Sequence, residues 1–284
     1  MIINKFLEEG DYDRVAFKIL IKELEAIRHK LREAPNTWGS KLEYQPKLHW
    51  SRDWELPWAI INSEVKSGER ILDCGCGNSS LLPLLQRFGC EAYGSDPYIF
   101  DFFCSYKKYY LGLITKVIKR IVCAKCYNEN NEKKKQESPQ KSFFKNREYR
   151  LEILKKIKSK LCYRKHIDPN RAGFKVRYFD YGIEKLHFPD NFFDKVFCIS
   201  VIEHLPKQIA YKGMREMGRV LKPEGLLIVT VDNDGLHINP ELINSYEKLI
   251  SESGLKLFGN SDFAKPDPQN IPGIYNVVGF ILKK

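Results

Sequence analysis

The sequence has no run of apolar residues long enough to cross a membrane, which takes about 20 of them, so no transmembrane segment is expected. Its first residues lack the basic start and apolar stretch of a secretory signal peptide. Eight cysteines among 284 residues are too few for a disulfide-based fold. These absences argue against a membrane-spanning protein and a disulfide-rich secreted domain, and they predict a reduced, cytoplasmic protein.

The cysteines also lack the two tight pairs of a strong zinc site. Cys123 and Cys126 have the C-x-x-C spacing, but only Cys162 and His166, at a long separation, are available to complete a ligand set. No metal site is predicted, and whether those four residues bind zinc or are ordinary thiols stays open. The spacing of Cys74 and Cys76 is that of a glycine loop and not of a metal site, so they are expected to be small packing residues.

The composition predicts a large core, because 43% of the residues are hydrophobic and 13% are aromatic. The net charge of +11 is concentrated in residues 101–170, which hold 19 Lys and Arg against 7 Asp and Glu. Apolar residues at helical spacing predict two basic amphipathic helices there, at 106–127 and 147–161. This insertion is compatible with a solvated helical hairpin, with a contact to an anionic membrane surface or lipid-linked substrate, and with RNA binding.

Strand and helix patterns alternate through the rest of the chain from residue 59 onward. This alternation predicts an α/β fold, a doubly wound and mostly parallel sheet with helices on both faces. No helix separates the last two strands, which are therefore expected to be antiparallel. A helix at 12–33 and a tryptophan-rich segment at 34–58 come first. The expected strands are 69–73, 90–96, 174–180, 195–200, 226–231, 255–258 and 275–282, and the expected helices are 79–88, 207–221 and 240–253.

A glycine turn follows the first of these strands. Gly75 and Gly77 allow a sharp turn and a close ligand approach, and the next helix begins directly after them. Asp96 ends the following strand, where a carboxylate can accept hydrogen bonds from both hydroxyls of a ribose. These features alone fit a dinucleotide or S-adenosylmethionine. The second ligand is favoured by Ser80, which replaces the third fingerprint glycine, and by Asp73, which can hold an ammonium group.

Four segments together carry a family resemblance: LDCGCGNSS (72–80), YGSDPY (93–98), FDYGIEKLHFPDNFFDKVFCISVIEHLP (179–206) and MREMGRVLKPEGLLIVTVD (214–232). In this order and spacing the sequence resembles the class I S-adenosylmethionine-dependent methyltransferases, over residues 59–100 and 171–284. The resemblance implies a seven-stranded sheet whose last strand is antiparallel. It also implies S-adenosyl-L-methionine as cofactor and S-adenosyl-L-homocysteine as product.

The same resemblance assigns roles to single residues. Asp73, Gly75 and Gly77 would line the methionine end of the cofactor, and Asp96, with Pro97 beside it, would bind the ribose. Asp180 and Tyr181 would flank the adenine. Ser200, Val201 and His204 would border the reactive methyl, with His204 as the candidate catalytic base.

The absence of one motif reduces the number of possible acceptor classes. After the fourth strand of the methyltransferase pattern, the chain reads Ser200-Val201-Ile202-Glu203 and not Asn/Asp-Pro-Pro-Tyr/Phe, which argues against the amino-methylating DNA and glutamine enzymes. Small molecules, sugars or lipid-linked glycans are therefore expected ahead of RNA and protein. An RNA methyltransferase, a non-catalytic cofactor-binding or membrane-docking module and an NAD-linked oxidoreductase remain alternatives, and no oligomeric state is predicted.

The expected domains are an N-terminal extension at 1–58 and a methyltransferase domain at 59–284, interrupted by the insertion at 101–170. The extension would act as a lid, with tryptophans that either stack on an acceptor or dock the N-terminal helix on the sheet. His49, Arg52 and Asp53 are its polar groups most worth testing. A soluble cytoplasmic protein with a peripheral membrane contact through the insertion fits these expectations.

Overall fold

The computed structural model of the chain describes residues 2–6, 9–33, 50–77, 79–98, 169–231, 246–262 and 277–284. The chain divides into two units, Met1–Phe100 with Ile167–Lys284, and Asp101–His166. The described residues all belong to the first unit. The predicted basic helices, Cys123, Cys126, Cys162 and His166 lie outside the described residues, so their roles stay predictions.

One mixed sheet forms the centre of the described unit, with the strand order β4-β3-β2-β5-β6-β9-β1-β8 and with β7 also paired to β9. Strands β2 to β6 run parallel to one another. Strand β9 is antiparallel to β6 and to β7, and the pair of β7 and β9 is the antiparallel last pair that the sequence predicted. The strands are β1 (Ile2–Phe6), β2 (Arg70–Cys74), β3 (Glu91–Ser95), β4 (Val176–Phe179), β5 (Phe193–Ile199), β6 (Leu221–Val231), β7 (Lys256–Leu257), β8 (Asn260–Asp262) and β9 (Val278–Lys283).

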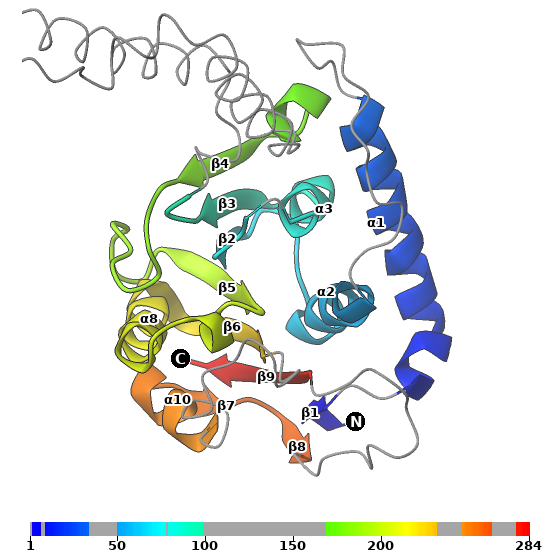
Figure 1. Ribbon diagram of the computed structural model, residues 1–284. Coiled ribbons are helices and arrows are strands. Elements are labelled where there is room, and N and C mark those ends of the chain that lie inside the picture. The colour runs from blue at the N-terminus through cyan, green and yellow to red at the C-terminus, as the bar shows by residue number, and fades with distance from the viewer. Residues whose placement is uncertain are drawn as a thin grey trace, which may run out of the picture. The chain divides into compact units, whose positions relative to one another are not determined.

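Helices cover both faces of this sheet, which confirms the doubly wound α/β class. Figure 1 shows α1 (Val15–Glu33), α2 (Trp50–Ser63) and α3 (Leu81–Arg87) on one side, and α8 (Lys207–Val220) and α10 (Tyr246–Ser253) on the other. Short 3-10 helices occupy Glu9–Asp13 (η1), Pro169–Ala172 (η2) and Ile202–His204 (η3). Because parallel strands have helices on both faces, their side chains are apolar in continuous runs, as in the buried end of β6.

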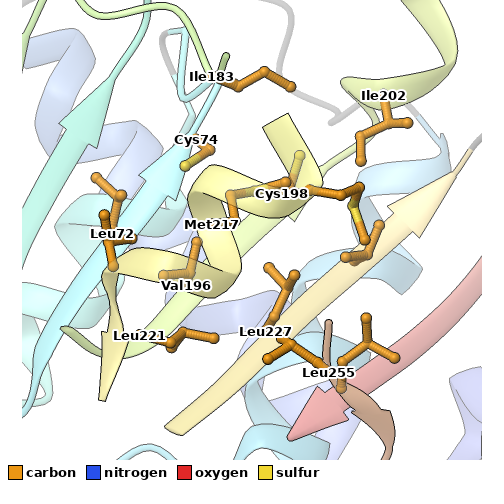
Figure 2. Packing of buried hydrophobic residues seen from close by; sticks show 14 of the residues in the cluster. Leu72, Cys74, Ile183, Val196, Cys198, Ile202, Met217, Leu221, Leu227 and Leu255 are labelled. Carbon is orange, nitrogen blue, oxygen red and sulfur yellow. The ribbon is translucent and has the colours of Figure 1, made fainter. Parts of the chain in front are cut away.

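A hydrophobic core lies between the sheet and α8. Figure 2 shows Met217 of α8 above the strand residues Val196 and Leu72, with Leu227 of β6 beside them. All four side chains are fully buried. Burying a side chain of this size contributes about 1.5–3 kcal/mol, so this layer holds the parallel strands, and the loops at their ends, in a fixed arrangement.

The number of strands differs from the prediction: the described part of the sheet has nine, not seven. The N-terminal extension begins with a strand, β1, which is antiparallel to β9 and parallel to β8. Asn4 of β1 is fully buried; its amide donates to the carbonyls of Phe258 (2.9 Å) and Asn260 (3.2 Å), and its oxygen accepts from the Ile281 N–H (2.7 Å). One side chain thus links β1 to the junction of β7 and β8 and to β9.

The tryptophan-rich segment contains a helix that was not predicted, α2, with Pro57 inside it. Trp54 and Trp58 are buried and stack with ring centroids 5.4 Å apart. The Trp54 indole N–H donates to Asp11 (2.8 Å). A Cβ added at Gly279 of β9 would lie 2.6 Å from the Trp58 ring, so only glycine allows β9 to pack this closely against Trp58. These two tryptophans therefore dock α2 on the fold and do not stack on an acceptor. Trp38 lies outside the described residues.

Candidate functional site

The predicted glycine turn follows β2 and packs against the loop after β5. The N–H groups of Gly75 and Cys76 both donate to the carbonyl of Ser95 at the end of β3 (2.7 and 3.2 Å). Gly75 has a φ of +72°, and a Cβ added there would lie 2.5 Å from a methyl carbon of Val201. A side chain at this position would be both strained and blocked. The structure thus brings together two residues that are 126 positions apart.

Asp96 lies just past the end of β3, as predicted, and its carboxylate binds the glycine turn. One oxygen accepts from the Gly77 N–H (3.1 Å) and the other from the Tyr98 N–H (2.8 Å). A carboxylate has about four lone-pair sites, so Asp96, which is half-buried, can still accept bonds from two hydroxyl groups. Pro97 is exposed directly beside it. This arrangement fits the ribose of a nucleoside.

The end of β4 is tied to the end of β3. The Asp96 N–H donates to the Phe179 carbonyl (3.0 Å), and the Ser95 hydroxyl donates to the Tyr181 carbonyl (2.7 Å). Asp180 is exposed between these anchored residues, and the half-buried Tyr181 ring packs on Phe179 with centroids 5.4 Å apart. The predicted ribose and adenine residues therefore lie on neighbouring strand ends.

Asp73 is the most electrostatically unusual group of this edge. Its side chain is in β2 and buried, with a residue exposure of 2%. Burial raises the pKa of Asp73 to about 8; Arg52 lowers it and Asp96 raises it. Desolvation disfavours the ionised carboxyl, and a nearby cation favours it. At neutral pH, the binding of a ligand ammonium group to Asp73 would therefore release a proton from the Asp73 carboxyl group.

Ser200 and His204 follow β5, but the structure places them differently. Ser200 is buried with a φ of +47°, and its N–H donates to the Thr230 carbonyl (3.1 Å) at the end of β6. His204 ends the short helix η3, where its N–H donates to the Val201 carbonyl (3.1 Å) and its side chain is exposed. Ser200 is thus held inside the protein against the end of β6, and the side chain of His204 is open to solvent.

Helix α2 contributes two charged residues to this edge. Glu55, which the sequence analysis did not single out, accepts hydrogen bonds from the hydroxyls of Ser200 and Thr230 (2.6 Å for Thr230) and from Arg52. Arg52 was noted only as a polar group worth testing. The sole signal of this pair is an Arg and a Glu three positions apart on one helix, which is a common surface pattern. No local sequence pattern predicts that α2 packs on the strand ends.

Cys74 and Cys76 are buried, as the sequence predicted for small packing residues. Cys74, Cys76, Cys90 and Cys198 are buried free thiols. Burial raises the pKa of Cys74, Cys76 and Cys198, so these thiols stay neutral and serve as packing groups. Within the described ranges, no group of three or more His, Cys, Asp or Glu side chains is arranged to hold a metal ion. In the same part of the chain, no helix combines the length and apolarity that crossing a membrane requires.

A family model described as a methyltransferase domain matches residues 59–255 of this chain. The match covers the glycine turn, the ends of β2 to β6 and both helices of the opposite face. The chain therefore belongs to this methyltransferase family, and the predicted membership among the class I S-adenosylmethionine-dependent methyltransferases is confirmed.

Two curated proteins share parts of the sequence. An uncharacterised protein of Methanocaldococcus jannaschii is 39% identical over 88 residues, which are 31% of this chain and 38% of that protein. The probable methyltransferase ltbC of Aspergillus luteorubrus is 31% identical over 100 residues, 34% of this chain and 35% of that protein. The matched regions thus span little more than a third of either relative.

Among solved structures, a SAM-dependent methyltransferase from Aquifex aeolicus is 15% identical, with a TM-score of 0.44. The alignment covers 93% of this chain and 97% of that one. At this score the likeness carries no argument about function, which rests on the family match and on the site.

Proposed function

We propose that this protein binds S-adenosyl-L-methionine across the ends of β2, β3 and β4 and transfers its methyl group to a small-molecule, sugar or lipid-linked glycan acceptor. The observation that carries the proposal is the pair of carboxylates, Asp73 and Asp96, on neighbouring parallel strands around the Gly75–Gly77 turn. They supply one buried acid for an ammonium group and one hydrogen-bonded acid for two hydroxyls. A nucleoside attached to an amino acid requires both.

The residues of the site each have a task in this proposal. Asp73 binds the ammonium, Asp96 the ribose hydroxyls, and Asp180 with Tyr181 the adenine, while Gly75 and Gly77 let the backbone approach the ligand. Val201 and Ser200 form the wall next to the reactive carbon. S-adenosylmethionine supplies a methyl group on a sulfonium, which an acceptor atom displaces in line. The protein contributes positioning and exclusion of water, which account for much of the rate of such reactions.

An oxygen acceptor must lose a proton as it attacks, and His204 is the proposed base. Its side chain is exposed, one loop beyond β5, so an acceptor can reach it from solvent. The product S-adenosyl-L-homocysteine keeps every group that Asp73 and Asp96 contact, so it should bind as well and serves as a stable probe of the site.

Titration calorimetry tests the cofactor with S-adenosylmethionine, S-adenosylhomocysteine and NAD, on the full chain and on Asp96→Ala. We expect the first two to bind, and the variant to weaken them ~10- to 100-fold, since a hydrogen bond to a charged group contributes about 1.5–3 kcal/mol. Asp13→Ala is the matched control, because the Asp13 side chain is 86% exposed and pairs only with Lys18 among the described ion pairs. Binding of NAD alone would favour an oxidoreductase.

The charge of residues 101–170 supports a second candidate, an RNA methyltransferase that holds its substrate through this insertion. Salt separates the two candidates. Binding to a polyanion weakens steeply as salt rises, by ~10³-fold or more between 50 and 200 mM for several phosphate contacts, and transfer to a neutral acceptor does not. Failure of labelled S-adenosylmethionine to turn over with any cell extract would instead support a non-catalytic module that docks on an anionic membrane or binds cofactor only.

A further inference from the structure

Glu55 joins α2 to the strand ends from inside the protein. Its side chain is fully buried. One carboxylate oxygen accepts hydrogen bonds from Ser200 at the end of β5 and from Thr230 at the end of β6, and the other contacts Arg52. A buried carboxylate is stable only when its charge is matched by donors and a cation. These three partners provide that match, and they hold α2 at one position relative to the sheet.

Arg52 is oriented by this arrangement. Its side chain is 31% exposed, while that of Glu55 is fully buried, so part of the Arg52 side chain reaches solvent. Burial works against its charge, but attraction to Glu55, Glu203 and Asp73 raises the pKa of Arg52 overall. A guanidinium has five N–H donors, and the contact with Glu55 engages only Nη1 among the described partners of Arg52. The remaining donors are available to a ligand.

Asp73 and Arg52 are a carboxyl group and a cation that act on each other. Each changes the pKa of the other, and Asp73 is at the glycine turn where the amino-acid end of the cofactor would lie. That end carries an ammonium and a carboxylate on the same carbon atom. A site that recognises both groups needs an acid next to a cation, and in the described part of this edge Arg52 is the cation that acts on Asp73.

We infer that Arg52 binds the carboxylate of the cofactor's amino-acid end and that Glu55 is the positioning residue that holds Arg52 in place. The planar guanidinium suits a carboxylate, since the two can form paired hydrogen bonds. This inference rests on the proposed function, because it names a further contact of the same cofactor. It gives α2 a role in binding that neither the glycine turn nor the acids of β2 and β3 can fill.

The test compares two ligands that differ in one group. S-adenosylhomocysteine carries the carboxylate, and S-adenosyl-3-thiopropylamine is the same molecule without it. In the wild-type chain we expect the first to bind more tightly. Arg52→Gln should lower the ratio of the two affinities ~10- to 100-fold, the loss expected for hydrogen bonds between charged groups. Arg215→Gln is the matched control, because Arg215 is 58% exposed on α8 and pairs only with Glu252 among the described ion pairs.

The ratio is the informative quantity for Arg52. Removing this cation also raises the pKa of Asp73, which weakens the binding of both ligands through their shared ammonium group. That effect cancels in the ratio. If Arg52→Gln weakens both ligands equally, Arg52 does not contact the carboxylate and the inference is wrong. If the wild-type chain binds neither ligand, the proposed function fails as well, so the two failures are distinct.

Glu55→Gln tests the positioning role. The glutamine oxygen can still accept from Ser200 and Thr230, but the ion pair with Arg52 is lost. We expect the affinity ratio to fall in the same direction as in Arg52→Gln, ~3- to 10-fold, because the cation stays but is less well oriented. A merely structural Glu55 would lower the melting temperature and leave the ratio unchanged, and that result would overturn its assignment.

Discussion

Asn4 and Asp73 are both polar and buried in the same sheet, yet their surroundings differ in kind. Each polar atom of the Asn4 side chain has a backbone partner, at Phe258, Asn260 or Ile281. Asp73 is surrounded by charges instead, and burial raises its pKa to about 8. A neutral group with a complete set of partners stabilises the fold. A buried carboxyl group whose pKa is raised to about 8 supports the proposal that a cationic ligand binds beside it.

Asp73→Asn should have the largest effect of the changes that test this comparison. The side chain keeps its shape but loses the charge that binds the ligand ammonium, and breaking a buried ion pair costs about 3–5 kcal/mol. We expect the affinity for S-adenosylhomocysteine to fall ~100-fold or more. Calorimetry with Asp13→Asn as the exposed control measures this. An affinity within threefold of wild type would mean that Asp73 does not contact the ligand.

Asn4→Ala should change stability and not binding. The substitution leaves two carbonyls and one N–H of the sheet without their partner, and the loss for unsatisfied buried groups is about 1–3 kcal/mol each. We expect the free energy of unfolding, measured in urea at 20 °C, to fall by ~3 kcal/mol in total. Binding of S-adenosylhomocysteine to the folded variant should be unchanged. A loss of affinity without a loss of stability would show that Asn4 acts in binding and not in stabilising the fold.

His204→Gln should lower turnover and leave cofactor binding intact. A positioned base contributes typically 10²- to 10⁴-fold to a rate, and the exposed ring argues for the lower end, ~100-fold. Transfer of a labelled methyl group into a panel of sugar and phenol acceptors measures the rate, and S-adenosylhomocysteine affinity is the control for folding. His29→Gln, in an exposed position of α1, is the matched variant. An unchanged rate with an active acceptor would remove His204 from the mechanism.

The pH dependence of binding tests the ionisation of Asp73 in the wild-type chain. Because the ligand ammonium needs ionised Asp73, whose pKa is about 8, the affinity for S-adenosylhomocysteine should rise by up to about tenfold per pH unit from pH 6 to 8. Stability should change in the opposite direction. The pKa is raised above its unfolded value of 3.8, so this group's contribution is complete below pH 3.8 and is lost as the pH rises through 8.

Asp73→Asn separates these two trends from the titration of other groups. The affinity of the variant for S-adenosylhomocysteine should not change between pH 6 and 8. Its melting temperature should increase relative to that of the wild type as the pH rises. If the difference between the melting temperatures of the two proteins stays constant from pH 5 to 8.5, Asp73 titrates at its ordinary pKa in the folded chain.

Much of the fold followed from local patterns. Apolar strands alternate with helices along the chain, and the strand–glycine–helix pattern around Gly75 is contained within ten residues, so both could be recognised without knowing what packs on what. Strand β1 could not be found in this way. It has five residues, its partners are more than 250 positions away, and the buried Asn4 makes it look polar.

The candidate site divides along the same line. The amino-acid sequence alone indicated Asp73, Gly75, Gly77 and Asp96, because acids and glycines at the ends of consecutive strands must meet at one edge of a parallel sheet. Only the folded chain brings Glu55 to Ser200 and Thr230, which are 145 and 175 positions away from it. A local pattern carries no information about such contacts. They arise because Trp54 and Trp58 dock α2 on the sheet and thereby direct Arg52 and Glu55 toward the strand ends.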